Sequence, residues 1–72
     1  MQVNICGTYR DRLGLYHLPE LCNFVQTATD AVKWAIDEVD YLERRHGFKI
    51  LSCAVYSYNP NTGDELLIKQ II

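Results

Sequence analysis

Apolar residues recur at helical spacing between residues 28 and 46, and this segment gives the clearest pattern in the chain. Thr27 and Thr29 are candidate N-caps, Asp30 suits the positive start of a helix, and Gly47 is a natural residue just past its end. At about 100° per residue, the core-facing stripe consists of Ala28, Ala31, Val32, Ala35, Val39 and Leu42. We therefore predict a helix over about 28–46 with one face against the core.

After Gly47 the period of the pattern changes to two. Residues 48–59 and 65–72 are rich in β-branched and aromatic residues, and the segment 59–64 between them is dense in turn formers. This arrangement predicts a β-hairpin. One face of its first strand is expected to carry Leu51, Cys53 and Val55, and the other Ser52, Ala54, Tyr56 and Tyr58.

The N-terminal part of the chain predicts at least one further strand, over residues 2–9. Residues 10–26 are less regular. There, 10–12 reads as a polar turn, 13–18 as a short returning strand, and 20–24 as one helical turn opened by Pro19. We therefore expect an α+β fold, a small β(β)αββ domain spanning residues 1–72. Its antiparallel or mixed sheet would have 3–4 strands, with the long helix packed on one face.

A chain of 72 residues is near the lower end of what folds alone, although 49% hydrophobic and 22% charged residues are ordinary for a globular domain. So short a chain buries only about 60% of its unfolded surface. The last strand also carries apolar residues on both faces, including Leu66, Leu67, Ile68 and Ile71. A partner is therefore expected to complete the core, and a homodimer is one candidate.

Charge and cysteine usage narrow the compartment and the partners. The net charge of −2 disfavours a sequence-independent grip on nucleic-acid phosphates. No apolar run approaches the ~20 residues that a membrane span needs, and the first residues lack the basic region of a signal peptide. The three cysteines form no CxxC pair, and the apolar surroundings of Cys6 and Cys53 suggest core positions. We expect a soluble cytoplasmic protein without membrane contact.

Residues suited to catalysis are present but poorly arranged. Cys22 follows His17 by five residues, yet nothing in the sequence brings the two within hydrogen-bond reach. The cysteines and histidines lack the spacing of a zinc site, and the helix acids are expected to face solvent. No phosphate-binding or dinucleotide-binding glycine motif occurs. These features argue against an enzyme, a metal or a cofactor.

Nucleic-acid binding has one feature in its favour. Tyr56 and Tyr58 would share a sheet face and offer rings for unpaired bases to stack on. The seven basic residues, however, are scattered along the sequence. A single-stranded nucleic-acid-binding module therefore remains an alternative, and direct nucleic-acid binding is disfavoured.

The strongest candidate for a contact surface lies on the predicted helix. Trp34 and Tyr41 are one heptad apart, off the core stripe, and bordered by Asp37, Glu38 and Arg45. Amphipathic aromatic residues of this kind dominate interface energetics. We predict that these five residues form a partner-binding site. The rival interpretation is that residues 10–26 cover both rings.

The segment 14–22, with its Pro19-Glu20-Leu21 turn, is followed by Thr27-Ala28-Thr29-Asp30-Ala31. This order resembles the HicB-type antitoxins, in which a proline-acid-leucine turn leads through Thr-x-x-Glu-Ala into a helix, and it implies an antitoxin subunit. In size, charge and α+β plan the chain is also similar to small acidic phage proteins that act against host defences, including anti-CRISPR inhibitors. Our leading hypothesis is therefore a non-catalytic inhibitor or accessory factor that docks on a larger protein or nucleoprotein complex.

Overall fold

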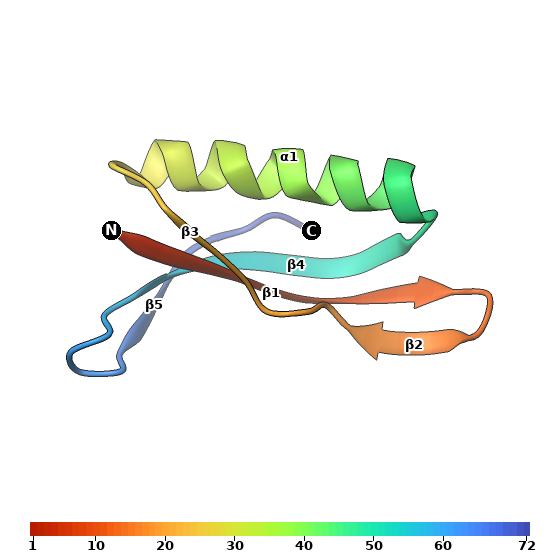
Figure 1. Ribbon diagram of the computed structural model, residues 1–72, viewed down its shortest axis with the longest axis horizontal. Coiled ribbons are helices and arrows are strands. Elements are labelled where there is room, and N and C mark those ends of the chain that lie inside the picture. Colours follow the sequence, from red (N-terminus) through yellow and green to blue (C-terminus); the bar gives the residue numbers. More distant parts are fainter.

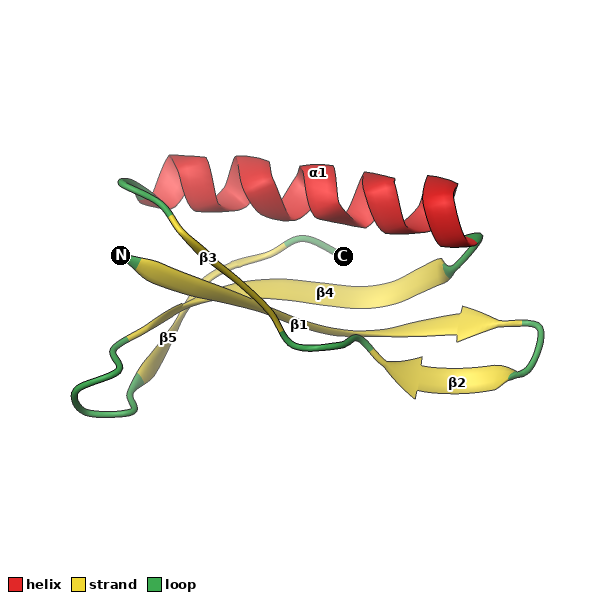
Figure 2. Ribbon diagram, viewed as in Figure 1, coloured by secondary structure: helices red, strands yellow, loops and turns green.

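In the computed structural model, which describes residues 1–72, one helix lies across one face of a five-stranded antiparallel sheet (Figures 1 and 2). The elements in chain order are β1 (Gln2–Asp11), β2 (Gly14–His17), β3 (Leu21–Phe24), α1 (Ala28–His46), β4 (Lys49–Tyr58) and β5 (Glu65–Gln70). This confirms the predicted α+β architecture, with the long helix on one side of the sheet.

The long strand β1 organises the sheet. It pairs with β4 along one side, and β5 continues the sheet beyond β4. On its other side β1 pairs with two short strands placed end to end, with Asn4 opposite Cys22 of β3 and Thr8 opposite His17 of β2. The segment 18–20 between β2 and β3 stays attached to β1 through the amide of Leu18, which donates to the Gly7 carbonyl at 2.9 Å.

Residues 20–24 do not form the predicted helical turn, and the sheet has five strands in place of the expected 3–4. The short returning strand expected within 13–18 is present as β2, but Leu21–Phe24 forms the additional strand β3. The physical reason is that β1 supplies a ladder of backbone partners along this whole edge, extended by a bond from the Val25 amide to the Met1 carbonyl (2.9 Å). An isolated helical turn has no comparable set of backbone bonds.

The helix boundaries agree with the prediction of 28–46. The Thr27 hydroxyl accepts a hydrogen bond from the Asp30 amide (3.1 Å) and caps the start. At the other end Gly47 takes the left-handed conformation with φ 68°, and its amide donates to the Glu43 carbonyl (3.1 Å). No helix of the structure is both long enough and apolar enough to cross a lipid bilayer.

The hydrophobic core lies between α1 and the sheet. Its ten buried residues are Val3, Ile5, Leu18, Ala31, Ala35, Val39, Leu42, Ile50, Cys53 and Val55. The two alanines are fully buried, so the first turns of α1 approach the sheet closely. Of the predicted helix stripe, Val32 is only half-buried and Ala28 is exposed, because both lie where α1 meets the edge of the sheet near β5.

The prediction for the start of β4 is wrong by one residue. We expected Leu51 on the same face as Cys53 and Val55, but Leu51 is 41% exposed, and Ile50 is buried with them. The register explains this, because Thr8 pairs with Ser52 whereas the next residue, Tyr9, pairs with Ile50. Leu51 is the extra residue of a β-bulge, and a one-residue shift moves a side chain to the other face of the sheet. Cys53 and Val55 do face the core as predicted.

Candidate functional site

Of the five residues predicted to bind a partner, Trp34, Glu38, Tyr41 and Arg45 lie along one flank of α1, whereas Asp37 lies on the outer side of the helix, next to the groove of the opposite flank. Tyr41 is 54% exposed, and Arg45 and Asp37 are exposed as well. Glu38 is half-buried. Trp34 is also half-buried and packs against the hydrophobic core, so its ring supports the fold as well as contributing surface. The accessible part of the predicted site is therefore centred on Tyr41 and Arg45.

Tyr41 is the first member of a continuous row of five aromatic rings. It meets His46 edge to face at 6.2 Å between ring centroids. His46 stacks on Phe48 at 5.2 Å, Phe48 on Tyr9 at 4.1 Å, and Tyr9 on Tyr16 at 5.5 Å. We call Tyr41, His46, Phe48, Tyr9 and Tyr16 the aromatic row. It joins four segments of the chain: the last turns of α1, the residue that precedes β4, β1 and β2.

The local structure explains how these rings come together. Gly47 turns the chain sharply after α1 and places His46 and Phe48 on either side of the turn. Tyr9 and Tyr16 face each other because β1 and β2 form an antiparallel hairpin in which they are direct partners. The carboxylate of Asp11 holds that hairpin turn by accepting from the amides of Leu13 (2.7 Å) and Gly14 (3.2 Å).

Sequence reasoning missed most of the aromatic row. In the predictions His46 is only the last residue of the helix, and Phe48 is only the first residue of the following strand segment. One signal was available, since a hairpin around the polar turn would place Tyr9 opposite Tyr16. The contact of both with Phe48 depends on how α1 meets the sheet, which no local pattern specifies.

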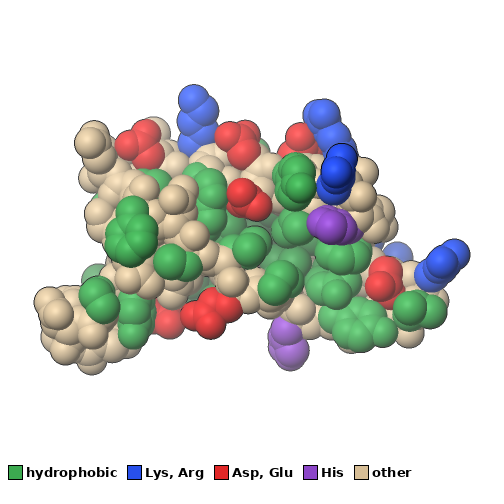
Figure 3. All heavy atoms as spheres, viewed as in Figure 1, with side chains coloured by type: hydrophobic (Ala, Val, Ile, Leu, Met, Phe, Trp, Pro, Cys, Tyr) green, Lys and Arg blue, Asp and Glu red, His purple; other side chains and the backbone are tan.

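Basic residues that are scattered in the sequence gather at the same end of the molecule. Arg10 is paired with Lys49 across β1 and β4, and Arg12 lines a cavity of about 430 Å³ together with His46 and Gly47. Arg45 lines a neighbouring cavity of about 410 Å³ with Asp40, Tyr41 and Arg44. In Figure 3 basic side chains project around this end, and hydrophobic side chains gather beneath the C-terminal half of α1. The aromatic row is therefore bordered by positive charge.

Some of the local charge is already neutralised. Asp40 forms an ion pair with Arg44 at 3.1 Å, one helical turn away. The Glu43 carboxylate accepts a hydrogen bond from the Ile50 amide at 3.3 Å and thereby ties α1 to β4. Both acids are thus engaged within the protein, whereas Arg45 and Arg12, which line the two cavities beside the row, form no ion pair.

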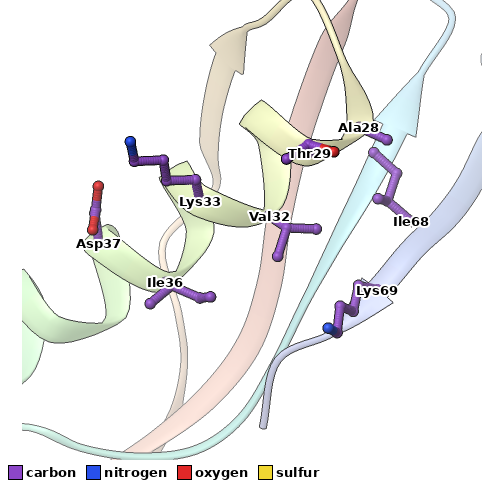
Figure 4. Close-up of a pocket in the computed structure, with 8 residues that line it drawn as sticks. All are labelled: Ala28, Thr29, Val32, Lys33, Ile36, Asp37, Ile68 and Lys69. Carbon is purple, nitrogen blue, oxygen red and sulfur yellow. The ribbon is translucent and has the colours of Figure 1, made fainter.

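The opposite flank of α1 carries the largest hollow of the surface, a groove of about 530 Å³ between the helix and β5. Figure 4 shows Val32 and Ile36 projecting from α1 toward the side of the groove where Ile68 and Lys69 lie. Lys33 and Asp37 point away from it, toward the outer side of the helix. Four of its eight lining residues are hydrophobic, and the others are Thr29, Lys33, Asp37 and Lys69, so the groove offers a mixed apolar and charged contact surface.

Tyr56 and Tyr58 lie on the sheet face turned away from α1, opposite Asn4 and Gln2 of β1, and both are half-buried. Their strand partners in β5 are Leu67 and Glu65. The basic cluster around Arg10 and Lys49 lies at the other end of β1 and β4. The rings and the positive charge that a single-stranded nucleic-acid site would combine are therefore separated along the sheet.

The cysteines are placed differently from one another. Cys53 is buried as predicted, but Cys6 is exposed, because it lies on the face of β1 that α1 does not cover. Burial raises the pKa of the Cys53 thiol, and the nearby Cys6 raises it further. A raised pKa keeps a thiol protonated and poorly nucleophilic near neutral pH. Cys22 is exposed on β3.

No three His, Cys, Asp or Glu side chains are grouped closely enough to hold a metal ion. The geometry of the molecule thus offers contact surfaces, above all the aromatic row with its arginines. Comparison with known proteins adds no identification, since the chain matches no protein-family model, no curated protein and no solved structure.

Proposed function

We propose that the protein is a non-catalytic interaction protein that docks on a larger protein through the aromatic row and the arginines beside it. The observation that carries this proposal is the row itself, in which five rings from four chain segments stack at one end of the molecule. Tyr41 and Tyr16, at the two ends of the row, are 54% and 43% exposed.

Tyrosine and arginine are the residue types that most often supply binding energy at protein interfaces. Rings that are already stacked lose little conformational freedom on binding, which lowers the entropic cost of association. Positive charge from Arg45 and Arg12 beside the rings favours a partner surface with carboxylates around an apolar centre. Such a partner surface is complementary to the aromatic row and to the two arginines beside it.

A protein partner suits this site better than unpaired bases do. A base stacks on a free ring face. Tyr9, however, already stacks with two rings of the protein, Phe48 and Tyr16. Phe48 is likewise held between Tyr9 and His46. The inner faces of the row are therefore occupied by the protein itself, and mainly ring edges and the outer rings are left for contact.

The finer part of the proposal is that docking inhibits or modifies the partner, in the manner of a small phage protein directed against a host defence complex. Its support is the small size of the chain, together with a raised thiol pKa at Cys6 and Cys53 that argues against cysteine nucleophiles. A blocker of this kind needs a surface and no reactive group. Its target would be a larger protein or nucleoprotein complex.

The test uses wild-type protein and the double variant Tyr41→Ala/Arg45→Ala as matched baits in native-host lysate, with Asn61→Ala in the exposed β4–β5 loop as control. A captured protein is purified, and its affinity is measured by calorimetry. We expect the double variant to bind at least about tenfold more weakly, which is ~1.4 kcal/mol, and Asn61→Ala to bind normally. Equal affinity of all three proteins, or capture of nucleic acid that is lost steeply with salt, would refute the proposal.

A second candidate is an antitoxin subunit, and one local feature favours it. The chain breaks between β2 and β3 at Leu18–Glu20 and then enters α1 through the Thr27 cap, as the resemblance to HicB-type antitoxins implies. Co-expression separates the two proposals. An antitoxin would relieve the growth defect caused by a neighbouring toxin, whereas an inhibitor of a host complex would not.

A further inference from the structure

The face of the sheet away from α1 holds a second site, independent of the aromatic row. A cavity of about 260 Å³ opens there, lined mainly by Asn4, Cys6, Gly7, His17, Glu20 and Glu65. These residues come from β1, from the end of β2, from the segment between β2 and β3, and from the first residue of β5. In the sheet order β4 separates β5 from β1. The twist of the sheet nevertheless brings Glu65 to the same cavity as Glu20.

The two carboxylates also influence one side chain of β1. Burial raises the pKa of the Cys6 thiol, and the negative charges of Glu65 and Glu20 raise it further. Both carboxylates therefore act on the same side chain on β1. The walls of the cavity supply negative charge and several hydrogen-bond acceptors.

Beside these walls lies an unsatisfied polar group. Asn4 is only 5% exposed, and its Oδ1 atom is buried without a hydrogen-bond partner. A buried acceptor that lacks a donor is unusual in proteins and costs about 1–3 kcal/mol of stability. Asn4 also lies on the same face of β1 as Cys6. Asn4 lines the cavity together with Glu20 and Glu65, and a rotation of its amide would turn the unpaired oxygen toward the cavity.

From this arrangement we propose that the cavity binds the protonated amine of an alkylammonium group. An ammonium carries three N–H donors and one positive charge, which match two carboxylates and one unpaired amide oxygen. The remaining lining residues, Ile5 and Leu18, are apolar but almost fully buried. The ammonium belongs either to a free polyamine or to a lysine side chain of a bound protein.

Gly7 accounts for part of the space in this cavity. A Cβ atom at this position would overlap the carbonyl oxygen of Ser52 and approach the Leu18 side chain to 2.9 Å. Glycine is therefore required where β1 meets both neighbours, and its missing side chain leaves room beside Cys6 and His17. Gly7 therefore permits the close packing of the strands and also lines the proposed amine site.

The experiment titrates spermidine into the protein and follows the backbone amide NMR signals of Asn4–Gly7 at constant ionic strength. We expect saturable shifts with a dissociation constant in about the millimolar range or tighter. Glu20→Gln/Glu65→Gln should weaken binding at least about tenfold. The control variant Asp30→Asn/Asp40→Asn removes the same charge from α1 and should bind within about twofold of wild type.

Asn4→Leu provides a second variant, whose side chain has the same number and branching of heavy atoms but no polar group. It removes the unpaired oxygen, so we expect an unchanged or higher melting temperature together with weaker spermidine binding. Circular dichroism establishes that each variant is folded. If folded Asn4→Leu and folded Glu20→Gln/Glu65→Gln both bind spermidine like wild type, the proposal is wrong.

Nα-acetyl-lysine amide, titrated in the same way, distinguishes the two sources of the amine. Similar affinity for both probes assigns the site to a lysine side chain of a partner, and binding of spermidine alone assigns it to free polyamines. The absence of shifts with both probes would overturn the proposal. Equal shifts with Mg²⁺ would do so too, because they would show only diffuse attraction of cations to an acidic surface.

Discussion

His46 and Phe48 stack across Gly47, with ring centroids 5.2 Å apart and ring planes 19° apart. The two rings belong to the last residue of α1 and to the residue that precedes β4. Gly47 between them has φ 68°, so the chain turns at this residue and the two rings remain in contact. The C-terminal cap of the helix is therefore also the element that joins Tyr41 to the rest of the aromatic row.

Replacement of Gly47 by alanine should lower the free energy of unfolding by about 1 kcal/mol, because a Cβ atom disfavours the left-handed conformation. Nothing lies within 4 Å of the added Cβ, so the cost is conformational only. Urea denaturation measures it, and Gly47→Asn should lose less. Gly63→Ala, at φ 76° in the β4–β5 loop, is the matched control. Both variants should lose stability, but only Gly47→Ala should weaken partner binding, and equal effects on binding would contradict the role of the cap.

Replacement of Gly7 by alanine should be far more harmful, with a loss of about 3 kcal/mol or more. The added methyl group would overlap the Ser52 carbonyl oxygen, which belongs to the strand backbone and cannot move aside easily. Thr8→Val at the next residue is the comparison, since it only removes the hydroxyl bond to Ser52 (2.8 Å) and should cost about 1 kcal/mol. Thermal unfolding compares the two, and a Gly7→Ala protein as stable as Thr8→Val would show that the strands can separate.

The parts of the fold that follow from local sequence were predicted well. The signals for α1 lie within the helix and its caps, so Thr27, Asp30 and Gly47 were enough to place both ends. The β4–β5 hairpin was equally readable, because the turn formers of 59–64 and the flanking strands are contiguous, and the Asn59 amide closes the loop on the Asp64 carbonyl at 2.9 Å.

The errors concern long-range pairing. Residues 21–24 form a strand only because β1, about twenty residues earlier in the chain, offers a free edge. The exposure of Leu51 depends on a bulge between two strands that are distant in sequence. Of the candidate site, Tyr41 and Arg45 could be found from the helix period. A hairpin around the polar turn also places Tyr9 opposite Tyr16, but the contact with Phe48 could not be found, because it depends on how α1 meets the sheet.

Cys53 should be the only cysteine at which replacement by serine clearly destabilises the protein. It is buried in the core cluster, where a serine hydroxyl would lack a partner and cost about 1–3 kcal/mol. Cys22 is exposed, so Cys22→Ser should change the free energy of unfolding by less than about 0.5 kcal/mol. Chemical denaturation measures both. A folded Cys22→Ser protein that had lost its activity would contradict the non-catalytic proposal.

The raised pKa of the Cys53 thiol also predicts a dependence of stability on pH. As pH rises, the unfolded chain releases this proton first, so the contribution of the thiol to stability is complete below the ordinary thiol pKa. It is lost as pH rises toward the folded-state pKa. Cys53→Ala should therefore lose less stability between about pH 7 and 9.5 than wild type does. An identical decline in both proteins would assign the pH dependence to other groups.

Self-association through β5 is a further prediction. This strand is an edge of the sheet, and its Leu66 and Leu67 are 70% and 57% exposed. Exposed apolar residues on an open edge favour pairing with a second copy. Sedimentation at high micromolar concentration should show a species larger than 8.3 kDa. Leu66→Glu/Leu67→Glu should abolish it, whereas Leu13→Glu in the β1–β2 turn should not. A monomer in every case would refute the prediction.

Trp34 and Tyr41 should separate stability from binding, because the structure places the two rings in different surroundings. Trp34 is half-buried and packs on the core, so Trp34→Ala should cost about 3 kcal/mol of stability. Tyr41 touches His46 at the edge of the aromatic row and is mostly exposed. Tyr41→Ala should change stability by less than about 1 kcal/mol but weaken partner binding by about 2 kcal/mol or more.

Charge reversal at Asp37 and Glu38 completes this test. Glu38 is half-buried on the same flank and Asp37 is exposed on the outer side of the helix, so reversal should alter mainly the association rate and its salt dependence. Melting temperature and partner affinity are measured on the same sample of each variant. If Tyr41→Ala unfolds as readily as Trp34→Ala, both rings belong to the core. If Tyr41→Ala keeps its stability and full affinity, the partner docks elsewhere, and the groove between α1 and β5 becomes the next surface to test.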